Sequence, residues 1–129
     1  MAGQPFRSIG KTLIQKTRTL IERKENWTKG AFARNFGGYV VESASNDAVC
    51  WCVSGALRRV FAQEDAEAKT DKMYEKNNVF EQLNEVIKEG TKGVFGMISA
   101  FNDDSKTTHE DVLRVFDRVI EKYERRDGI

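Results

Sequence analysis

The densest group of residues able to do chemistry lies between positions 102 and 111. Carboxylates beside an imidazole suit general acid–base chemistry, and carboxylate oxygens with a histidine nitrogen also suit a divalent cation. One hypothesis is therefore a metal-dependent enzyme or ligand-binding site at Asn102, Asp103, His109 and Asp111, with Trp51 lining a pocket. The whole group comprises Asn102, Asp103, Asp104, Thr107, Thr108, His109, Glu110 and Asp111.

The same residues are explained without a ligand. Asn102 and Asp103 are typical of Asx turns, and Thr107 with Glu110 has the spacing of a capping box before a helix. Acidic side chains in the first turn also interact favourably with the helix dipole. We favour this structural interpretation, which leaves open why the loop holds so many acids.

The cysteines offer little nucleophilic or metal chemistry. Cys50 and Cys52 flank Trp51, and on a helix that spacing separates them by about 200° around the axis. They could then neither form a disulfide nor share a metal. His109 is the single histidine, so it is the sole imidazole base for either thiol, and Ser54 lacks the G-x-S-x-G context of a nucleophile elbow. We expect core cysteines, no catalytic residue and no cofactor.

Residues 6–25 have the apolar spacing of an amphipathic helix with a basic outer face. This face is a candidate partner-binding surface, a weak phosphate-contacting surface, or a solvated face, and the base rate for charged helix faces favours the last. The net charge of +1 argues against strong nucleic-acid binding. The basic residues are Arg7, Lys11, Lys16, Arg18 and Arg23.

An uncharged run that begins at Ala48 predicts a central helix over residues 48–61, buried nearly all round. Its apolar positions continue at spacings of three and four, and Ser45, Asn46 and Asp47 supply N-cap candidates. Gly55 costs helix propensity, and we expect a neighbouring helix to approach the bare backbone there. The predicted core contains Trp51, Cys50, Cys52, Gly55, Leu57 and, from the last helix, Phe116.

Three further helices are predicted downstream. One spans about residues 72–89 with Gly90 as its C′ residue, a short buried one lies within 93–101, and the last spans about 108–125. Upstream, residues 28–34 suggest a turn and a short helical piece. Residues 39–41 suggest an extended connection over the central helix.

The predicted fold is all-α: a compact single-domain bundle of about four to five helices. The domain covers residues 1–129, with a loose leader at 1–5, a loose tail at 127–129, and at most a minor extended segment near 39–41. The composition, 40% hydrophobic with 10% aromatic residues, suits a folded globule. There is neither an apolar run of membrane-spanning length nor a signal-peptide core, so we expect a cytoplasmic protein without a membrane partner.

Two motifs resemble a family of small uncharacterised bacterial and phage proteins. One is the W-C-x-x-G-A-L element at Trp51–Leu57, and the other is the N-D-x-x-x-T element at Asn102–Thr107 before the last helix. The resemblance covers roughly residues 27–120; it implies a shared fold and a link to mobile elements, and it transfers no catalytic residue. The leading hypothesis is a small non-enzymatic interaction protein, a phage or mobile-element accessory or inhibitor that binds a host protein. The alternatives are the site at residues 102–111 and weak nucleic-acid binding through the basic helix.

Overall fold

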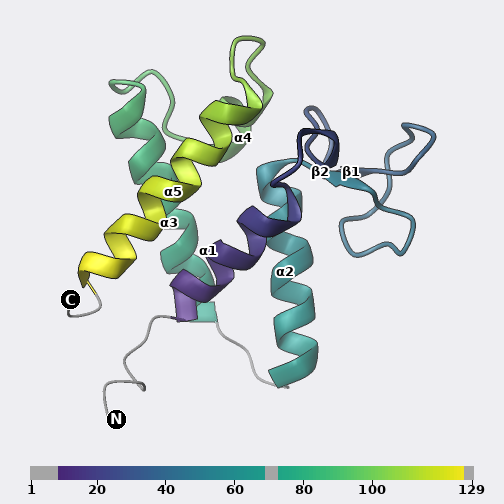
Figure 1. The fold of residues 1–129 in the computed structure, drawn as a ribbon, viewed down its shortest axis with the longest axis horizontal. Coiled ribbons are helices and arrows are strands. Elements are labelled where there is room, and N and C mark those ends of the chain that lie inside the picture. Colours follow the sequence, from purple (N-terminus) through teal and green to yellow (C-terminus); the bar gives the residue numbers. More distant parts are fainter. Residues whose placement is uncertain (1–8, 69–72, 127–129) are drawn as a thin grey trace.

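The computed structural model describes residues 9–68 and 73–126 of the chain (Figure 1). Within them lie five α-helices, one 3-10 turn and two short strands, which confirms the prediction of an all-α protein. The predicted leader at 1–5 and tail at 127–129 fall outside the described residues. In chain order the elements are α1 (Ile9–Leu20), η2 (Lys24–Asn26), β1 (Ala33–Arg34), β2 (Cys50–Trp51), α2 (Val53–Ala68), α3 (Met73–Gly90), α4 (Ile98–Asp103) and α5 (His109–Arg126).

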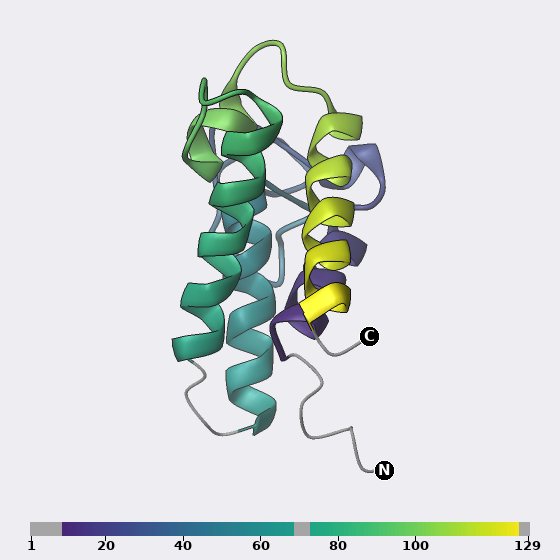
Figure 2. The ribbon, with the colours of Figure 1, turned by 90° about the vertical axis from the view of Figure 1, so that its left-hand side faces the viewer.

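The first helix has the most extensive contacts in the bundle. α1 packs against α2, α3 and α5, while α2, α3 and α5 are roughly aligned in Figure 2. α1 crosses α5 closely at Gly10, where an added Cβ would lie 2.6 Å from Tyr123 Oη. α1 ends at Leu20, short of the predicted residue 25. All five helices contribute to one apolar core, whose fully buried members include Leu13, Ile14, Leu57, Val79, Leu83, Val112, Phe116 and Val119.

The predicted central helix begins later than expected. Its apolar stretch divides into β2 and α2. The apolar run around Trp51 is short enough to be compatible with a strand as well as with a helix. β2 pairs antiparallel with β1, with Ala33 opposite Trp51 and Arg34 opposite Cys50, so the short helix predicted over 28–34 is wrong. The helix starts after Cys52, whose Sγ accepts the Gly55 N–H at 3.2 Å, and the predicted N-cap segment 45–47 lies in the preceding loop.

Gly55 permits a close backbone approach, as predicted, although its neighbour is not a helix. A Cβ added there would lie 1.8 Å from the carbonyl oxygen of Phe32. That oxygen belongs to the chain entering β1 and accepts the Cys52 N–H at 3.3 Å. Gly55 therefore lets the two-stranded sheet dock on the first turn of α2.

α3 has a different C-cap from the one predicted. Gly90 is the last helical residue, and the left-handed position is Lys92, with φ of 54°. The Lys92 N–H donates to Glu89 O at 3.3 Å and the Gly93 N–H to Lys88 O at 2.8 Å, which is the bonding pattern of a Schellman motif. Sequence favoured Gly90 because glycine is the usual left-handed residue, but a lysine holds that place.

The remaining helices differ from prediction mainly at their boundaries. The short helix in the 93–101 run begins at Ile98, and Val94 and Met97 before it are 73% and 65% exposed. α5 closely matches the predicted span of 108–125. Across residues 9–68 and 73–126, every helix is either too short or too polar to cross a lipid bilayer.

Candidate functional site

The polar residues around Asn102 form a hydrogen-bond network that joins the segment after η2 to the start of α2. Asn102, in the last turn of α4, is 1% exposed, and its Oδ1 accepts the Trp27 Nε1–H at 2.8 Å and the Val53 N–H at 3.1 Å. Its Nδ2 donates to Thr28 O at 3.1 Å and to Asp103 Oδ1 at 2.9 Å. One side chain thus joins η2, the start of α2 and α4, in place of the predicted Asx turn.

The neighbouring acids take part in hydrogen bonds of the same region. Asp103 Oδ1 accepts the Gly30 N–H at 3.0 Å, and Asp104 Oδ2 accepts the Lys106 N–H at 3.0 Å. The Lys29 ammonium group donates to the backbone oxygens of Asp104 at 2.5 Å and of Thr107 at 2.8 Å. The Asx turn of this loop is therefore made by Asp104.

The first turn of α5 uses a capping box one residue later than predicted. The Asp111 N–H donates to Thr108 Oγ1 at 3.1 Å, and the Thr108 N–H donates back to Asp111 Oδ2 at 3.0 Å. The predicted pair of Thr107 and Glu110 does not form it: Thr107 is buried, and Glu110 is exposed.

His109 lies inside the molecule and not in the polar loop. Its Nε2–H donates to Ile21 O at 2.7 Å, and its ring stacks at a tilt on Trp27, with centroids 5.7 Å apart. The structure does not bring Asn102, Asp103, His109 and Asp111 together as ligands. Within residues 9–68 and 73–126, no three His, Cys, Asp or Glu side chains form a group able to hold a metal ion.

The Cys50–Cys52 segment is packed, but not on a helix. Trp51 is 6% exposed, donates from Nε1 to Ser43 O at 3.0 Å, and lies under the Arg59 guanidinium. Cys52 is buried and Cys50 half-buried, and both are free thiols. Burial raises the pKa of the Cys52 thiol, although the Gly55 N–H acts in the opposite direction. Cys52 therefore stays protonated at neutral pH.

The predicted basic face of α1 is occupied by ion pairs within the chain. Lys11 pairs with Glu124 at 3.2 Å, Lys16 with Glu64 at 2.5 Å, and Arg18 with Asp117 at 2.8 Å. Beyond the helix, Arg23 pairs with Glu25 at 2.5 Å, and Arg7 lies outside the described residues. These cations bind α1 to α2 and α5, so the face is less available to phosphates or to an acidic partner than its sequence suggests.

A surface that the sequence did not single out displays aromatic side chains. Nine large hydrophobic residues are exposed within the described part of the chain, and five of them lie between positions 32 and 49: Phe32, Phe36, Tyr39, Val40 and Val49. Exposed apolar groups that gather in one region mark interaction sites, whereas scattered ones need no explanation. We call residues 32–41 the aromatic hairpin; it contains β1, which pairs with β2, and it lies at the edge of the bundle (Figure 1).

The aromatic hairpin is held in one conformation by hydrogen bonds. The Asn35 N–H donates to Tyr39 O and the Asn35 backbone carbonyl accepts the Gly38 N–H. The Asn35 Oδ1 also accepts the N–H groups of Gly37 at 2.9 Å and of Tyr39 at 3.0 Å. Gly38 has φ of 87°, the left-handed conformation expected at the end of a three-residue hairpin loop. Phe36, at the tip, is 95% exposed. The prediction that residues 39–41 cover the central helix is wrong for Tyr39 and Val40, 74% and 66% exposed.

A turn signal could have located this hairpin in the sequence. Asn35 followed by Gly37 and Gly38, with apolar residues on both sides, is typical of a short hairpin. Its exposure could not be read in the same way, because an apolar side chain is expected to be buried until the packing is known.

Comparison with known proteins identifies a family and no function. The family model described as "Family of unknown function (DUF6197)" matches residues 10–122, in keeping with the resemblance to an uncharacterised family noted from the sequence motifs. No curated protein matches the chain, and no solved structure matches it.

Proposed function

The chain belongs to the family of unknown function DUF6197, and we propose that it is a small protein-binding module that uses the aromatic hairpin as its contact surface. The observation that carries the proposal is Phe36, which is 95% exposed at the tip of a hydrogen-bonded turn. Leaving a phenylalanine in water forgoes about 1.5–3 kcal/mol of burial energy. A partner with an apolar pocket would recover that energy.

The order of the hairpin supports this proposal. Binding a flexible loop costs about 0.5–1.5 kcal/mol for each side chain that must be ordered, and a preformed turn avoids part of this cost. Arg58 lies 4.6 Å from the centre of the Phe32 ring and places a cation beside the aromatic surface. Phenylalanine, tyrosine and arginine are enriched in protein interfaces.

The proposed partner is a host protein, and the chain acts on it in the cytoplasm as an accessory of a phage or mobile element. This origin rests on the sequence motifs alone. No catalytic step is proposed, because the polar groups around Asn102 are engaged in hydrogen bonds within the chain.

Affinity capture from a host lysate tests the proposal, in parallel with nuclease and with chelator. The baits are the wild-type chain, Phe36→Ser, and Tyr74→Ser as a matched control, since Tyr74 on α3 is 73% exposed. We expect one stoichiometric protein to be retained by the wild type and by Tyr74→Ser in every condition, and to be lost from Phe36→Ser. Equal capture by all three baits, or loss of capture with nuclease, would contradict the proposal.

A further inference from the structure

One side of the aromatic hairpin is an open sheet edge. An antiparallel bridge joins Val40 to Arg34 of β1, and β1 pairs on its other side with β2. β1 therefore lies between Val40 and β2, and in the part of the chain that the structure describes no strand pairs with Val40 on its outer side. An uncovered edge of this kind is a template for pairing with another chain.

Two backbone hydrogen bonds fix the direction of the groups at this edge. The Asn35 N–H donates to Tyr39 O at 2.9 Å. The Val41 N–H donates to Ala33 O at 3.1 Å. These bonds flank Val40, which is the pattern of a non-hydrogen-bonded pair in an antiparallel ladder. Because a residue of such a pair turns its own N–H and C=O away from the neighbouring strand, both groups of Val40 point outward from the sheet.

The outward groups have no partner within the chain. Across residues 9–68 and 73–126, neither the N–H nor the C=O of Val40 takes part in a hydrogen bond, and the same holds for the Glu42 N–H. Alternate residues of an extended segment direct their N–H groups to the same side, so Glu42 continues the edge that begins at Val40. Val40 and Tyr39 are 66% and 74% exposed, so this edge is accessible to a second chain.

The sequence of the edge has none of the usual protection. Natural proteins shield an exposed edge with proline, lysine or a bulge, whereas Tyr39, Val40 and Val41 are uncharged residues that favour strands. The hairpin also holds this segment in place, because the Asn35 Oδ1 accepts the Tyr39 N–H at 3.0 Å. An ordered, uncharged edge with a free donor and a free acceptor favours an extended ligand over a helix, whose backbone groups are already bonded to each other.

We propose that the partner of the aromatic hairpin presents an extended segment that adds to this edge as a strand beside Val40. The inference rests on the proposed function, because it names the form in which the partner meets the same hairpin. Strand addition takes its affinity from main-chain hydrogen bonds and its specificity from alternate side chains. Since apolar cross-strand pairs are stabilising, the bound segment carries apolar residues at every second position.

Selection from a display library of random linear peptides, about 10 residues long, tests the proposal on the full chain. Val40→Pro is the counter-selection variant, because it removes an N–H that has no partner in the described chain, and proline is tolerated on edge strands. Circular dichroism checks that the variant keeps its fold. We expect enriched peptides with apolar residues at alternate positions. Their affinity for Val40→Pro should fall about tenfold or more, since a main-chain hydrogen bond and the fit of the added strand are lost together.

A second measurement changes the peptide and leaves the protein as it is. Each backbone nitrogen of an enriched peptide is methylated in turn, which removes one N–H at a time. A peptide bound as a strand turns only alternate N–H groups toward the edge, so affinity should fall at every second position and little at the positions between. Losses without this alternation would overturn the proposal.

Asn46→Pro is the matched control for the proline substitution. Asn46 is exposed and is the second residue of a turn in which the Ala48 N–H donates to Ser45 O at 3.2 Å, a position at which proline is favoured. Its affinity for the peptides should equal that of the wild type. An equal loss in Asn46→Pro and Val40→Pro would contradict a specific role of the edge.

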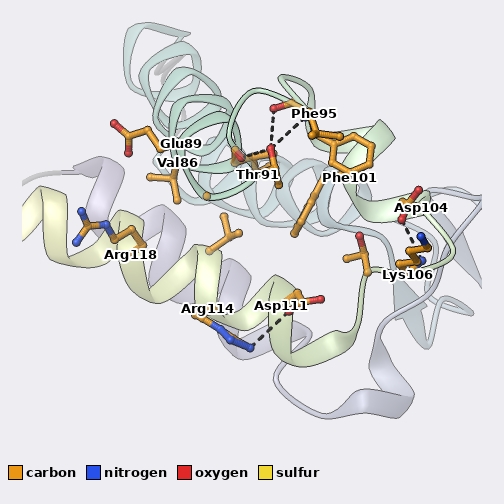
Figure 3. Close-up of a pocket in the computed structure, with 15 residues that line it drawn as sticks. Val86, Glu89, Thr91, Phe95, Phe101, Asp104, Lys106, Asp111, Arg114 and Arg118 are labelled. Atoms are coloured by element: carbon orange, nitrogen blue, oxygen red, sulfur yellow. Dashed lines mark hydrogen bonds and ion pairs between the residues drawn. The ribbon is translucent and has the colours of Figure 1, made fainter.

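A groove of about 730 Å³ between α3 and α5 is a competing site for peptides (Figure 3). The charged side chains of its lining are balanced: Glu89, Asp104 and Asp111 against Lys106, Arg114 and Arg118. Arg118→Glu changes this groove and should leave peptide affinity unchanged. Loss of binding in Arg118→Glu would assign the peptides to the groove and overturn the edge assignment.

The proposal is also overturned if no enriched peptide distinguishes the wild type from Val40→Pro. A dimer of the wild type in light scattering that Val40→Pro abolishes would assign the edge to a second copy and overturn it as well. Capture with Phe36→Ser stays a separate test of the proposed function. If Phe36→Ser loses the host protein while no peptide depends on Val40, only the strand addition is wrong. If peptides depend on Val40 while Phe36→Ser captures as well as the wild type, only the contact through Phe36 is wrong.

Discussion

Replacing Asn102 with leucine should be among the most damaging substitutions in this chain, although asparagine and leucine are similar in size. Asn102 is 1% exposed and satisfies the Trp27 Nε1–H, the Val53 N–H and the Thr28 carbonyl. Leucine can bond none of them. The fourth partner of Asn102, the Asp103 carboxylate, is exposed and can hydrogen-bond to water instead.

The magnitude follows from the three groups left without a partner. The bond to the Val53 N–H is buried, and those to Trp27 and Thr28 are partly buried. An unsatisfied buried polar group costs about 1–3 kcal/mol, so Asn102→Leu should lower the free energy of unfolding by about 3 kcal/mol. Because a domain of this kind is stable by about 5–15 kcal/mol, the variant should lose a substantial part of its stability. Asn46→Leu, at an exposed loop position, is the matched control and should change stability by less than about 0.5 kcal/mol.

Urea unfolding followed by circular dichroism measures both variants. A cycle with Trp27→Phe refines the test, since removing the indole N–H removes one unsatisfied donor and should reduce the cost of Asn102→Leu by about 1 kcal/mol. A loss below about 1 kcal/mol for Asn102→Leu would refute the view that the hydrogen bonds of this residue hold the segment after η2 against the start of α2.

The remaining predictions concern two backbone positions and the two cysteines. Gly55→Ala should destabilise by about 3 kcal/mol, since its Cβ would lie 1.8 Å from a backbone oxygen; near-native thermal unfolding would contradict this. Lys92→Gly should stabilise by about 1 kcal/mol by relieving a left-handed lysine, and a lower melting temperature would count against the Schellman assignment. Iodoacetamide should label half-buried Cys50 before Cys52, and equal rates would disprove the difference. Burial raises the pKa of the Cys52 thiol above its ordinary 9.0. The stability that the protonated, buried thiol contributes is therefore complete below that pH and is lost at higher pH, where the thiol of the unfolded chain ionises. Cys52→Ala should flatten this alkaline decline in the free energy of unfolding.

The sequence predicted best those elements whose apolar residues repeat at clear helical spacing. α3 and α5 match their predicted spans closely, and Leu57, Phe116 and Trp51 are buried as expected. Such a pattern is strong because each buried position is repeated several times along one face.

Boundaries and long-range partners were harder to predict for a physical reason. Thr107 and Thr108 are equally good caps by type, but Thr107 is buried and its backbone carbonyl accepts a hydrogen bond from Lys29, so Thr108 provides the cap. The two strands pair Ala33 with Trp51 and Arg34 with Cys50, far apart in the sequence, and a two-residue strand leaves no period to detect. Turn chemistry likewise suggested only local bonds for Asn102, whereas Trp27, Val53 and Thr28, three of its four partners, lie more than forty residues away.

The candidate site could be predicted only in part. Sequence pointed to charged groups, and the structure uses them internally: His109 bonds to Ile21 O, and Lys11, Lys16 and Arg18 form ion pairs. The aromatic hairpin remained unnoticed because exposure is a property of packing and not of residue type.

The most direct test of the protein-binding proposal is the dissociation constant of the captured partner, purified and titrated against the wild-type chain and Phe36→Ser. Phe36 makes few contacts within its own chain, being 95% exposed, so the substitution should leave folding intact. An aromatic interface anchor contributes about 2 kcal/mol or more, so we expect the dissociation constant to rise about 30-fold or more. An unchanged dissociation constant would contradict the assignment of the aromatic hairpin as the binding surface.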